Sequence, residues 1–251
     1  MHQFSKRKLV SLLSSAALIG ALFVATLPGV ASAATCTPTG FMRDGMNLTA
    51  AQIGGTVTGP LEATGCNIGV YYGPTDTGSV TAADVFGANY FGVLVNGASV
   101  DVTNSWVHNI GEVPFNGAQH GNAIVYLNGA SGTISGNTVY SYQKNGITVS
   151  GVDADGNPSS NPTTTASVLD NVVTGNGKID YIAQNGIQIS FGATALVRGN
   201  SVSENWYTPD GTIACGLLLY QANGVKTGQN RLFDNEVNFC NFGRGGGNLK
   251  P

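Results

Sequence analysis

One template recurs about every thirty residues along this chain, and this repeat limits the possible folds more than any other feature. In the clearest copy, 14 positions separate Gly186 from Asn200. The next copy has the same spacing between Gly216 and Asn230. A period in this range is typical of solenoids, in which each copy forms one coil that stacks on its neighbours.

A recurring Asn ends the template in each copy. One copy is longer, because 25 positions separate Gly146 from Asn171, which implies an insertion of 11 residues. Asn tolerates left-handed backbone, and its amide can bond the same group one coil away, so the repeat predicts ladders of stacked Asn. A second Asn follows the first by five positions in most copies. The first positions are Asn104, Asn137, Asn171, Asn200 and Asn230, and the second are Asn109, Asn176, Asn205 and Asn235.

Apolar residues alternate after the start of each copy, as in Ile187 and Ile189, and two further short apolar runs follow. Alternation predicts strands, and the Gly and Asn between them predict turns. Three short strands per coil, stacked in parallel, form an all-β parallel β-helix. The outward positions of the first strand carry no charge. They are Leu94, Val125, Thr148, Gln188 and Leu218, followed by Asn96, Leu127, Ser150, Ser190 and Tyr220.

Two motifs recur at the strand starts and turns. Asn-Gly-Ile occurs at 145–147 and 185–187, and Gly-Asn-x-Val occurs at 136–139 and 199–202. These motifs resemble those of the right-handed parallel β-helix repeat proteins, a superfamily that contains pectate lyases, alginate lyases, mannuronan epimerases and NosD-like periplasmic proteins. The resemblance covers residues 66–240 and implies right-handed coils. It leaves the activity open, because one scaffold hosts many functions.

Residues 1–34 have the features of a secretory signal peptide: a basic start, an apolar run and a small-residue ending at Ala31-Ser32-Ala33. A membrane anchor is the alternative, and the serines within the apolar run argue against it. We therefore expect a secreted protein in which residues 35–65 form an N-terminal cap or first coil. Residues 66–251 then form the β-helix domain.

Charge narrows the choice of partners. Without residues 1–34, 8 Lys and Arg remain against 14 Asp and Glu, a net charge of −6. This sign disfavours nucleic acid and anionic membrane surfaces as partners. We expect a monomer that has an extracellular polysaccharide as its partner.

Four cysteines in an exported chain predict two disulfides, for which three pairings exist. Cys36 and Cys66 lie 30 positions apart, and Cys215 and Cys240 lie 25 apart, so each pair fits neighbouring coils at one end of the solenoid. The predicted bonds are therefore Cys36–Cys66 and Cys215–Cys240.

Long loops at 110–121, 177–183 and 206–214 occupy corresponding places in their coils, so we expect them to line one side of the solenoid. They collect much of the chain's sparse supply of titratable and aromatic residues. The candidate catalytic residues are Lys144, Asp180, Tyr181 and His120, and the candidate substrate-binding residues are Trp206, Tyr207, Lys178 and Asp210.

Two chemistries of the superfamily apply to these residues. Lyases and epimerases remove a proton next to a uronate carboxylate, which requires a base and a group that neutralises the carboxylate. Lys144 or His120 could be the base, Tyr181 an acid and Lys178 the carboxylate partner. Glycoside hydrolysis requires paired carboxylates instead, and the lyase or epimerase is favoured. The carboxylates available for a pair are Asp180, Asp210 and Glu204.

A possible calcium site lies in the insertion, where Asp153, Asp155 and Asn157 alternate around Gly156. No acidic residue follows in the loop, so an ordinary turn is the favoured interpretation. No other cofactor is expected.

The sequence therefore predicts a secreted β-helix protein that binds or modifies an extracellular polysaccharide, with uronate-containing polymers favoured. The alternative is a non-catalytic surface or structural module. That alternative is supported by the uncharged strand face and by the small number of coils.

Overall fold

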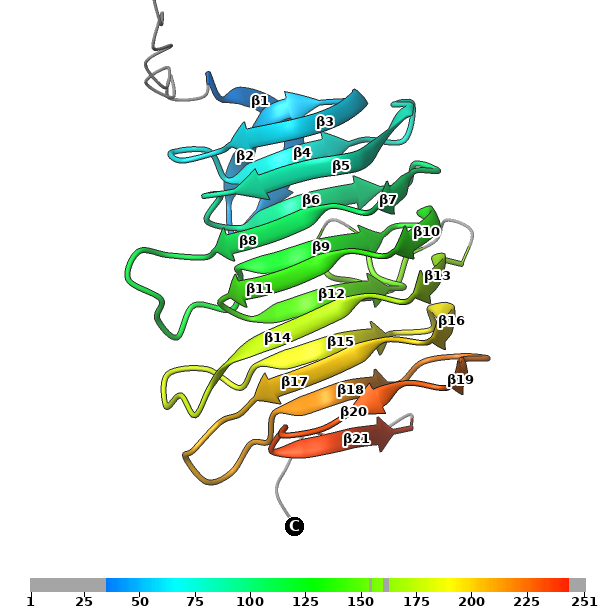
Figure 1. Cartoon of the computed structure of the whole chain (residues 1–251). Coiled ribbons are helices and arrows are strands. Elements are labelled where there is room, and N and C mark those ends of the chain that lie inside the picture. Colours follow the sequence, from blue (N-terminus) through cyan, green and yellow to red (C-terminus); the bar gives the residue numbers. More distant parts are fainter. Residues whose placement is uncertain (1–34, 154, 160–162, 244–251) are drawn as a thin grey trace, which may run out of the picture. The chain divides into compact units, whose positions relative to one another are not determined.

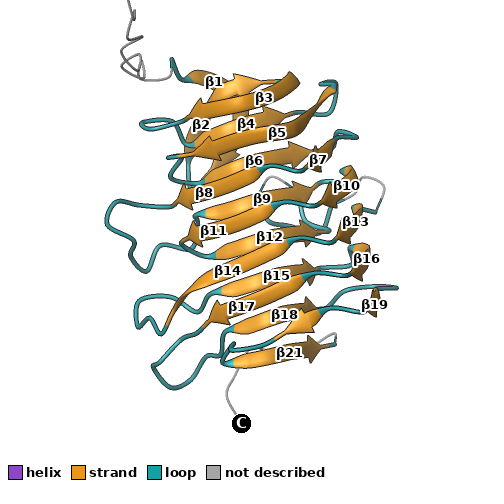
Figure 2. Cartoon of the chain, in the orientation of Figure 1, coloured by secondary structure: helices purple, strands orange, loops and turns teal. Residues whose placement is uncertain are grey.

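The computed structural model describes residues 35–153, 155–159 and 163–243. All regular elements in this part are β-strands, which form two sheets wound around one core (Figure 1, Figure 2). Each coil adds one strand to the nine-stranded sheet A and one or two strands to the twelve-stranded sheet B. Within the described residues, no helix is long and apolar enough to cross a membrane.

Sheet A is parallel except at its first strand, which pairs antiparallel with the second. Its strands are β1 (Thr37–Arg43), β2 (Met46–Ile53), β4 (Ile68–Tyr72), β6 (Phe91–Asn96), β9 (Asn122–Leu127), β12 (Asn145–Ser150), β15 (Asn185–Ser190), β18 (Cys215–Tyr220) and β21 (Val237–Phe242).

Sheet B bends at a corner between the two strands that each later coil contributes. Its strands are β3 (Gly55–Glu62), β5 (Gly78–Phe86), β7 (Asp101–Thr103), β8 (Trp106–Ile110), β10 (Ser131–Ser135), β11 (Thr138–Tyr142), β13 (Thr165–Leu169), β14 (Val172–Gly177), β16 (Thr194–Arg198), β17 (Ser201–Asn205), β19 (Lys226–Gly228) and β20 (Arg231–Leu232).

The predicted three strands per coil are present from β6 onward, but the earlier coils have two. The single strand β5 pairs with both β7 and β8. Ala83 occupies the corner position in β5, and its N–H donates to Ser105 Oγ of the next coil at 3.1 Å. The backbone turns at Ala82 (φ 49°), and β5 passes through the corner as one continuous strand.

The predicted alternation of apolar residues is confirmed. Inward side chains such as Ile187 and Ile189 on β15 join one continuous buried core. The same core includes Val93 on β6 and Leu219 on β18, so it extends along the whole stack. Burial of these stacked aliphatic rows supplies the main driving force for folding.

The predicted Asn ladder is confirmed at the corner of sheet B. The amide oxygens of Asn171, Asn200 and Asn230 each accept hydrogen bonds from the backbone N–H and the side-chain Nδ2 of the Asn in the preceding coil, at 2.9–3.0 Å. Each Nδ2 also donates to a backbone carbonyl of the coil before its own. The members are Asn137, Asn171, Asn200 and Asn230.

The predicted ladder position is wrong by one residue in the first copy, where Ser105 stands in place of Asn104. The N–H of Ser105 donates to Asn137 Oδ1 at 3.0 Å. Asn104 is exposed and has left-handed backbone (φ 50°), the conformation that Gly136 (φ 65°) and Gly199 (φ 71°) adopt in later coils. Asn104 is therefore a turn residue.

The second set of Asn residues forms a ladder only at the C-terminal end. The N–H and Nδ2 of Asn205 donate to Asn235 Oδ1 at 3.1 and 2.8 Å. The ladder stops at the hydroxyl of Tyr142, which donates to Asn205 Oδ1 at 2.6 Å. Asn176 donates to the Tyr142 carbonyl instead, and Asn109 is a turn residue with φ 54°.

The hairpin of β1 and β2 packs on the outer face of sheet A. Its turn is Asp44-Gly45, where both residues have positive φ. The ring of Phe41 lies 6.2 Å from the rings of Tyr71 and Phe91. This apolar cluster buries three of the predicted outward positions, Leu94, Val125 and Leu127. Their lack of charge therefore reflects packing.

Both predicted disulfides are present, Cys36–Cys66 and Cys215–Cys240. The first joins the residue before β1 to a residue before β4, and the second joins β18 to β21. They therefore hold strands at the two ends of sheet A, where one neighbouring coil is missing.

We expect Asn171→Ala to lower the free energy of unfolding by about 3 kcal/mol or more, because buried polar groups in both adjacent coils lose their partners. The side chain makes four hydrogen bonds, to Asn137, Ile134 and Asn200. Urea denaturation measures the change.

The matched control is Asn104→Gly, which keeps the left-handed turn and lies outside the ladder. Its effect should stay within about 0.5 kcal/mol. Equal losses in the two variants would contradict the assigned position of the ladder.

Candidate functional site

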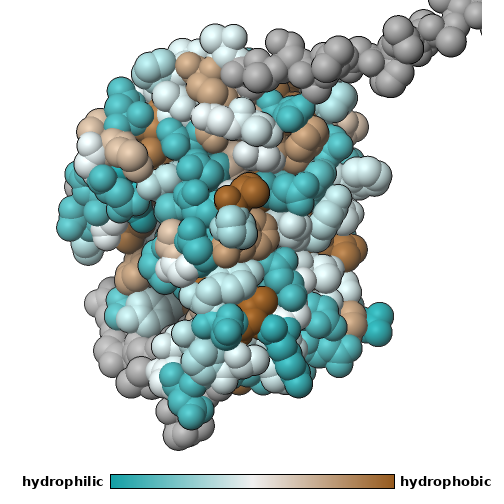
Figure 3. Space-filling view, turned by 90° about the vertical axis from the view of Figure 1, so that its left-hand side faces the viewer, coloured by the Kyte–Doolittle hydropathy of each residue, from teal (hydrophilic) through white to brown (hydrophobic). Residues whose placement is uncertain are grey.

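The three long loops lie on the same side of the solenoid, as the sequence predicted. They follow β8, β14 and β17 (Figure 1). Figure 3 shows that mainly hydrophilic residues cover this side, with a few separate hydrophobic spots.

Most of the predicted site residues lie on this side of the solenoid, called the loop side from here on. Lys178 Nζ lies 5.0 Å from the centre of the Trp206 ring, and Trp206 Nε1 donates to the Asp234 carbonyl at 2.7 Å. Burial raises the pKa of Tyr181. Trp206 is therefore held by the next coil through Asp234, and it contacts the loop of the preceding coil through Lys178. The predicted residues on this side are Lys178, Asp180, Tyr181, Trp206, Tyr207 and Asp210.

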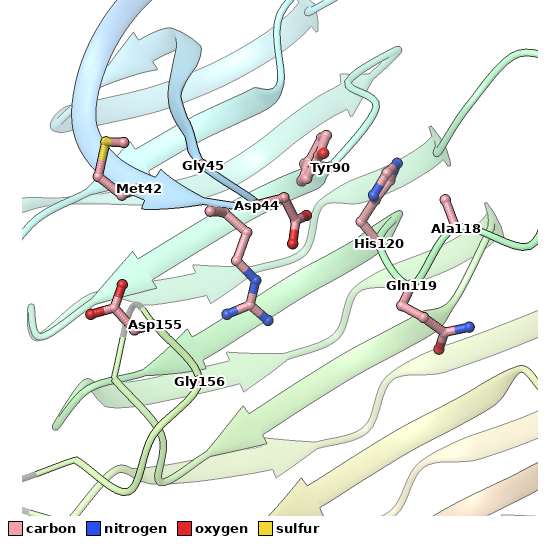
Figure 4. A pocket seen from close by; sticks show the side chains of 10 residues that line it. Met42, Asp44, Gly45, Tyr90, Ala118, Gln119, His120, Asp155 and Gly156 are labelled. Carbon is pink, nitrogen blue, oxygen red and sulfur yellow. The ribbon is translucent and has the colours of Figure 1, made fainter.

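The other two predicted residues, Lys144 and His120, line a groove over the outer face of sheet A. This sheet A groove consists of two hollows that share Arg43, Gln119 and Gly156. The larger hollow has a volume of about 580 Å³ and lies between the hairpin tip, the loop after β8 and the insertion after β12 (Figure 4). The smaller, of about 220 Å³, lies on β9, β12 and β15.

The hairpin tip supplies the groove with charges that the sequence analysis did not assign to a site. Burial, together with the nearby Asp44 carboxylate, raises the pKa of the Tyr90 hydroxyl. Arg43 extends toward the insertion, since a Cβ added to Gly156 would lie 3.6 Å from its Nη1. The sequence does contain a signal for this hairpin, because Asp-Gly between two alternating runs is typical of a tight β-turn.

His120 is held in place at the larger hollow. Its Nε2 lies 2.7 Å from Glu112 Oε1, and its ring stacks on Tyr90 with 3.8 Å between centroids. Figure 4 shows these two rings side by side at one wall. Asn89 Nδ2 also donates to Glu112 Oε1 at 3.2 Å, so the carboxylate has two partners.

The loop that carries His120 is shaped by Gln143, which is fully buried just before β12. Its Oε1 accepts from the N–H groups of Glu112 and Asn116, and its Nε2 donates to the carbonyl of Ala118. A single buried amide therefore fixes both ends of the loop.

Lys144 and Thr148 line the smaller hollow. Lys144 Nζ donates to the Ala183 carbonyl at 2.9 Å, and burial lowers the pKa of this amine to about 8. Thr148 is only 7 % exposed, and its Oγ1 has no hydrogen-bond partner in the described part of the chain. Such buried hydroxyls are ordinarily bonded. The hollow therefore contains a cation and an unused hydroxyl.

The proposed calcium residues form a turn. Asp153 Oδ1 accepts from the N–H groups of Asp155 and Asn157 at 3.0 and 2.9 Å. The described residues contain no group of three or more His, Cys, Asp or Glu that could hold a metal ion. Asp155 instead lies at the rim of the larger hollow (Figure 4).

Residues 61–242 match the sequence model of a family described as right handed beta helix region. The chain belongs to this right-handed β-helix family. The match confirms the family predicted from the Asn-Gly-Ile and Gly-Asn-x-Val motifs, and it gives the hand of the coils. No curated protein and no solved structure matches the chain. Because β-helix scaffolds host many functions, membership of the family does not determine the function of this chain.

The buried position of Lys144 makes stability depend on pH. Its pKa is about 8 in the folded chain and 10.5 ordinarily, so the unfolded chain binds more protons between these values. We therefore expect the free energy of unfolding to rise with pH across this window. The Lys144→Met variant should lack this contribution, as urea denaturation at a series of pH values will measure.

Lys178→Met, at an exposed lysine of the loop side, is the control and should follow the pH dependence of the unaltered chain. If Lys144→Met also follows it, Lys144 is not buried in the way described.

Proposed function

We propose that this protein is secreted and binds an acidic extracellular polysaccharide, of the uronate-containing class, in the sheet A groove. The observation that carries the proposal is that Arg43 and Lys144 line the same small hollow of a chain with 11 basic and 14 acidic residues. Two cations gathered on a net acidic protein favour a ligand that carries carboxylates.

The remaining groups of the groove suit the neutral parts of a sugar. Side-chain hydroxyls and amides of Thr148, Ser150, Gln188 and Asn145 line the smaller hollow and can bond ring hydroxyls. At the larger hollow, Gln119 adds a further side-chain amide. Few polar groups and some apolar surface are typical of ligand pockets.

Secretion is supported by two features. Residues 1–34 have the composition of a signal peptide, and all four cysteines are in disulfides. Disulfides persist in oxidising compartments, which is where extracellular polysaccharides are found.

Lyase activity is a second candidate, and the lowered pKa of Lys144 favours it. A neutral Lys144 amine would take the proton next to the uronate carboxylate, and Arg43 would stabilise the negative charge that develops there. The electron pair then forms a carbon–carbon double bond while the glycosidic carbon–oxygen bond breaks. The leaving oxygen takes up a proton, which gives an unsaturated sugar and a new chain end.

We expect Arg43→Ala and Lys144→Met each to weaken the binding of polygalacturonate fragments about tenfold or more, because each removes a charge-assisted contact worth about 1.5–3 kcal/mol. Isothermal titration calorimetry measures the affinities. Arg198→Ala and Lys226→Met, which alter cations on sheet B, are the matched controls and should bind normally.

Failure of the unaltered, folded protein to bind polyuronate fragments would overturn the proposal. Equal losses in the sheet A and sheet B variants would overturn the assigned site. Ultraviolet absorbance of an unsaturated product, abolished by Lys144→Met, would identify the lyase. Binding without such a product would identify a non-catalytic binding protein.

A further inference from the structure

We infer that the sheet A groove receives the end of a polysaccharide chain or a short oligosaccharide, and not the interior of a long polymer. The inference rests on the proposed function and specifies which part of the ligand is bound. It depends on three segments that surround the groove and on the contact between two of them, Arg43 of the hairpin tip and Gly156 of the insertion.

The contact lies between the hairpin tip and the insertion. Gly156 is so close to Arg43 that an added Cβ would be 3.6 Å from Nη1. Both residues line both hollows, so their contact stands where the two hollows join. Gln119, the third shared residue, belongs to the loop after β8. A ligand that occupies both hollows therefore has to pass between three segments.

Each of the three segments is anchored to the solenoid. The hairpin is tied by the Cys36–Cys66 disulfide and by the packing of Phe41 on sheet A. In the insertion, Ser159 Oγ donates to Asn128 Oδ1 at 2.9 Å, and the Asn128 N–H donates to the Val152 carbonyl at 2.8 Å. The hydrogen bonds of Gln143 hold the third segment, the loop after β8. The walls are therefore part of the fold.

The smaller hollow adjoins the Arg43–Gly156 contact and contains groups that can bind a ligand. Thr148 on β12 is more than nine-tenths buried, and its Oγ1 lacks a hydrogen-bond partner within the described residues. Lys144, directly before β12, places a cation in the same hollow. Taken together, the two hollows of about 580 and 220 Å³ fall within the range of about 300–1,000 Å³ that is typical of pockets for small ligands. A terminal uronate that enters the smaller hollow would contact both the Thr148 hydroxyl and the Lys144 amine.

Counting binding sites per gram of polymer tests this inference. Polygalacturonate is fractionated into samples of different mean chain length, and calorimetry measures how many protein molecules each gram binds. If chain ends bind, halving the chain length doubles the binding capacity per gram, whereas the affinity per site stays constant. If chain interiors bind, the capacity per gram is the same for long and short samples.

Equal capacity for long and short chains overturns the inference and leaves the proposed function standing. Absence of binding to every sample overturns both. Arg43→Ser, which removes the contact with the insertion, provides an independent check with Arg198→Ser as its control. We expect Arg43→Ser to bind more weakly and to gain capacity on long chains. If its capacity still follows the number of chain ends, the Arg43 contact does not restrict access.

Discussion

Hydrogen bonds between buried Asn side chains hold the coils from Asn137 to Asn230 in register with one another. Each amide of the corner ladder pairs with a backbone N–H and a backbone carbonyl of the preceding coil, so the polar groups of the turn are paired without water. The same bonds fix where sheet B bends, and so they fix which side chains point into the core. In β5, where Ala83 takes the place of the Asn, the chain bends at Ala82 but a single strand spans the corner.

The groove arises where the chain departs from this regular pattern. An antiparallel hairpin at the start, an insertion after β12 and the loop after β8 all reach over the outer face of sheet A. The stacked strands supply a rigid floor with Thr148 and Lys144, while the added segments supply Arg43 and His120. This division matches the general behaviour of solenoids, in which the coils provide support and the insertions provide the chemistry.

The fold could be predicted from the sequence because each copy of the repeat gives its coil the same geometry. The inward rows, the corner ladder and both disulfides follow from spacing alone. The ladder position predicted at Asn104 is wrong, because Asn suits both a ladder and a left-handed turn, and only pairing with Asn137 distinguishes the two. For the site, Lys144 and His120 were predicted but Arg43 was not. Its turn has a local signal, whereas the docking of Phe41 on Phe91 depends on tertiary packing across fifty positions.

The proposed ligand site lies over sheet A and not at the loop side. Hydrogen–deuterium exchange of the protein with and without a uronate oligosaccharide tests it most directly. With the oligosaccharide bound, we expect slower hydrogen–deuterium exchange in residues 42–45, 118–122 and 155–157, and unchanged exchange in residues 206–214. Slower exchange confined to residues 178–181 and 206–214 would contradict it and would place the ligand beside Trp206.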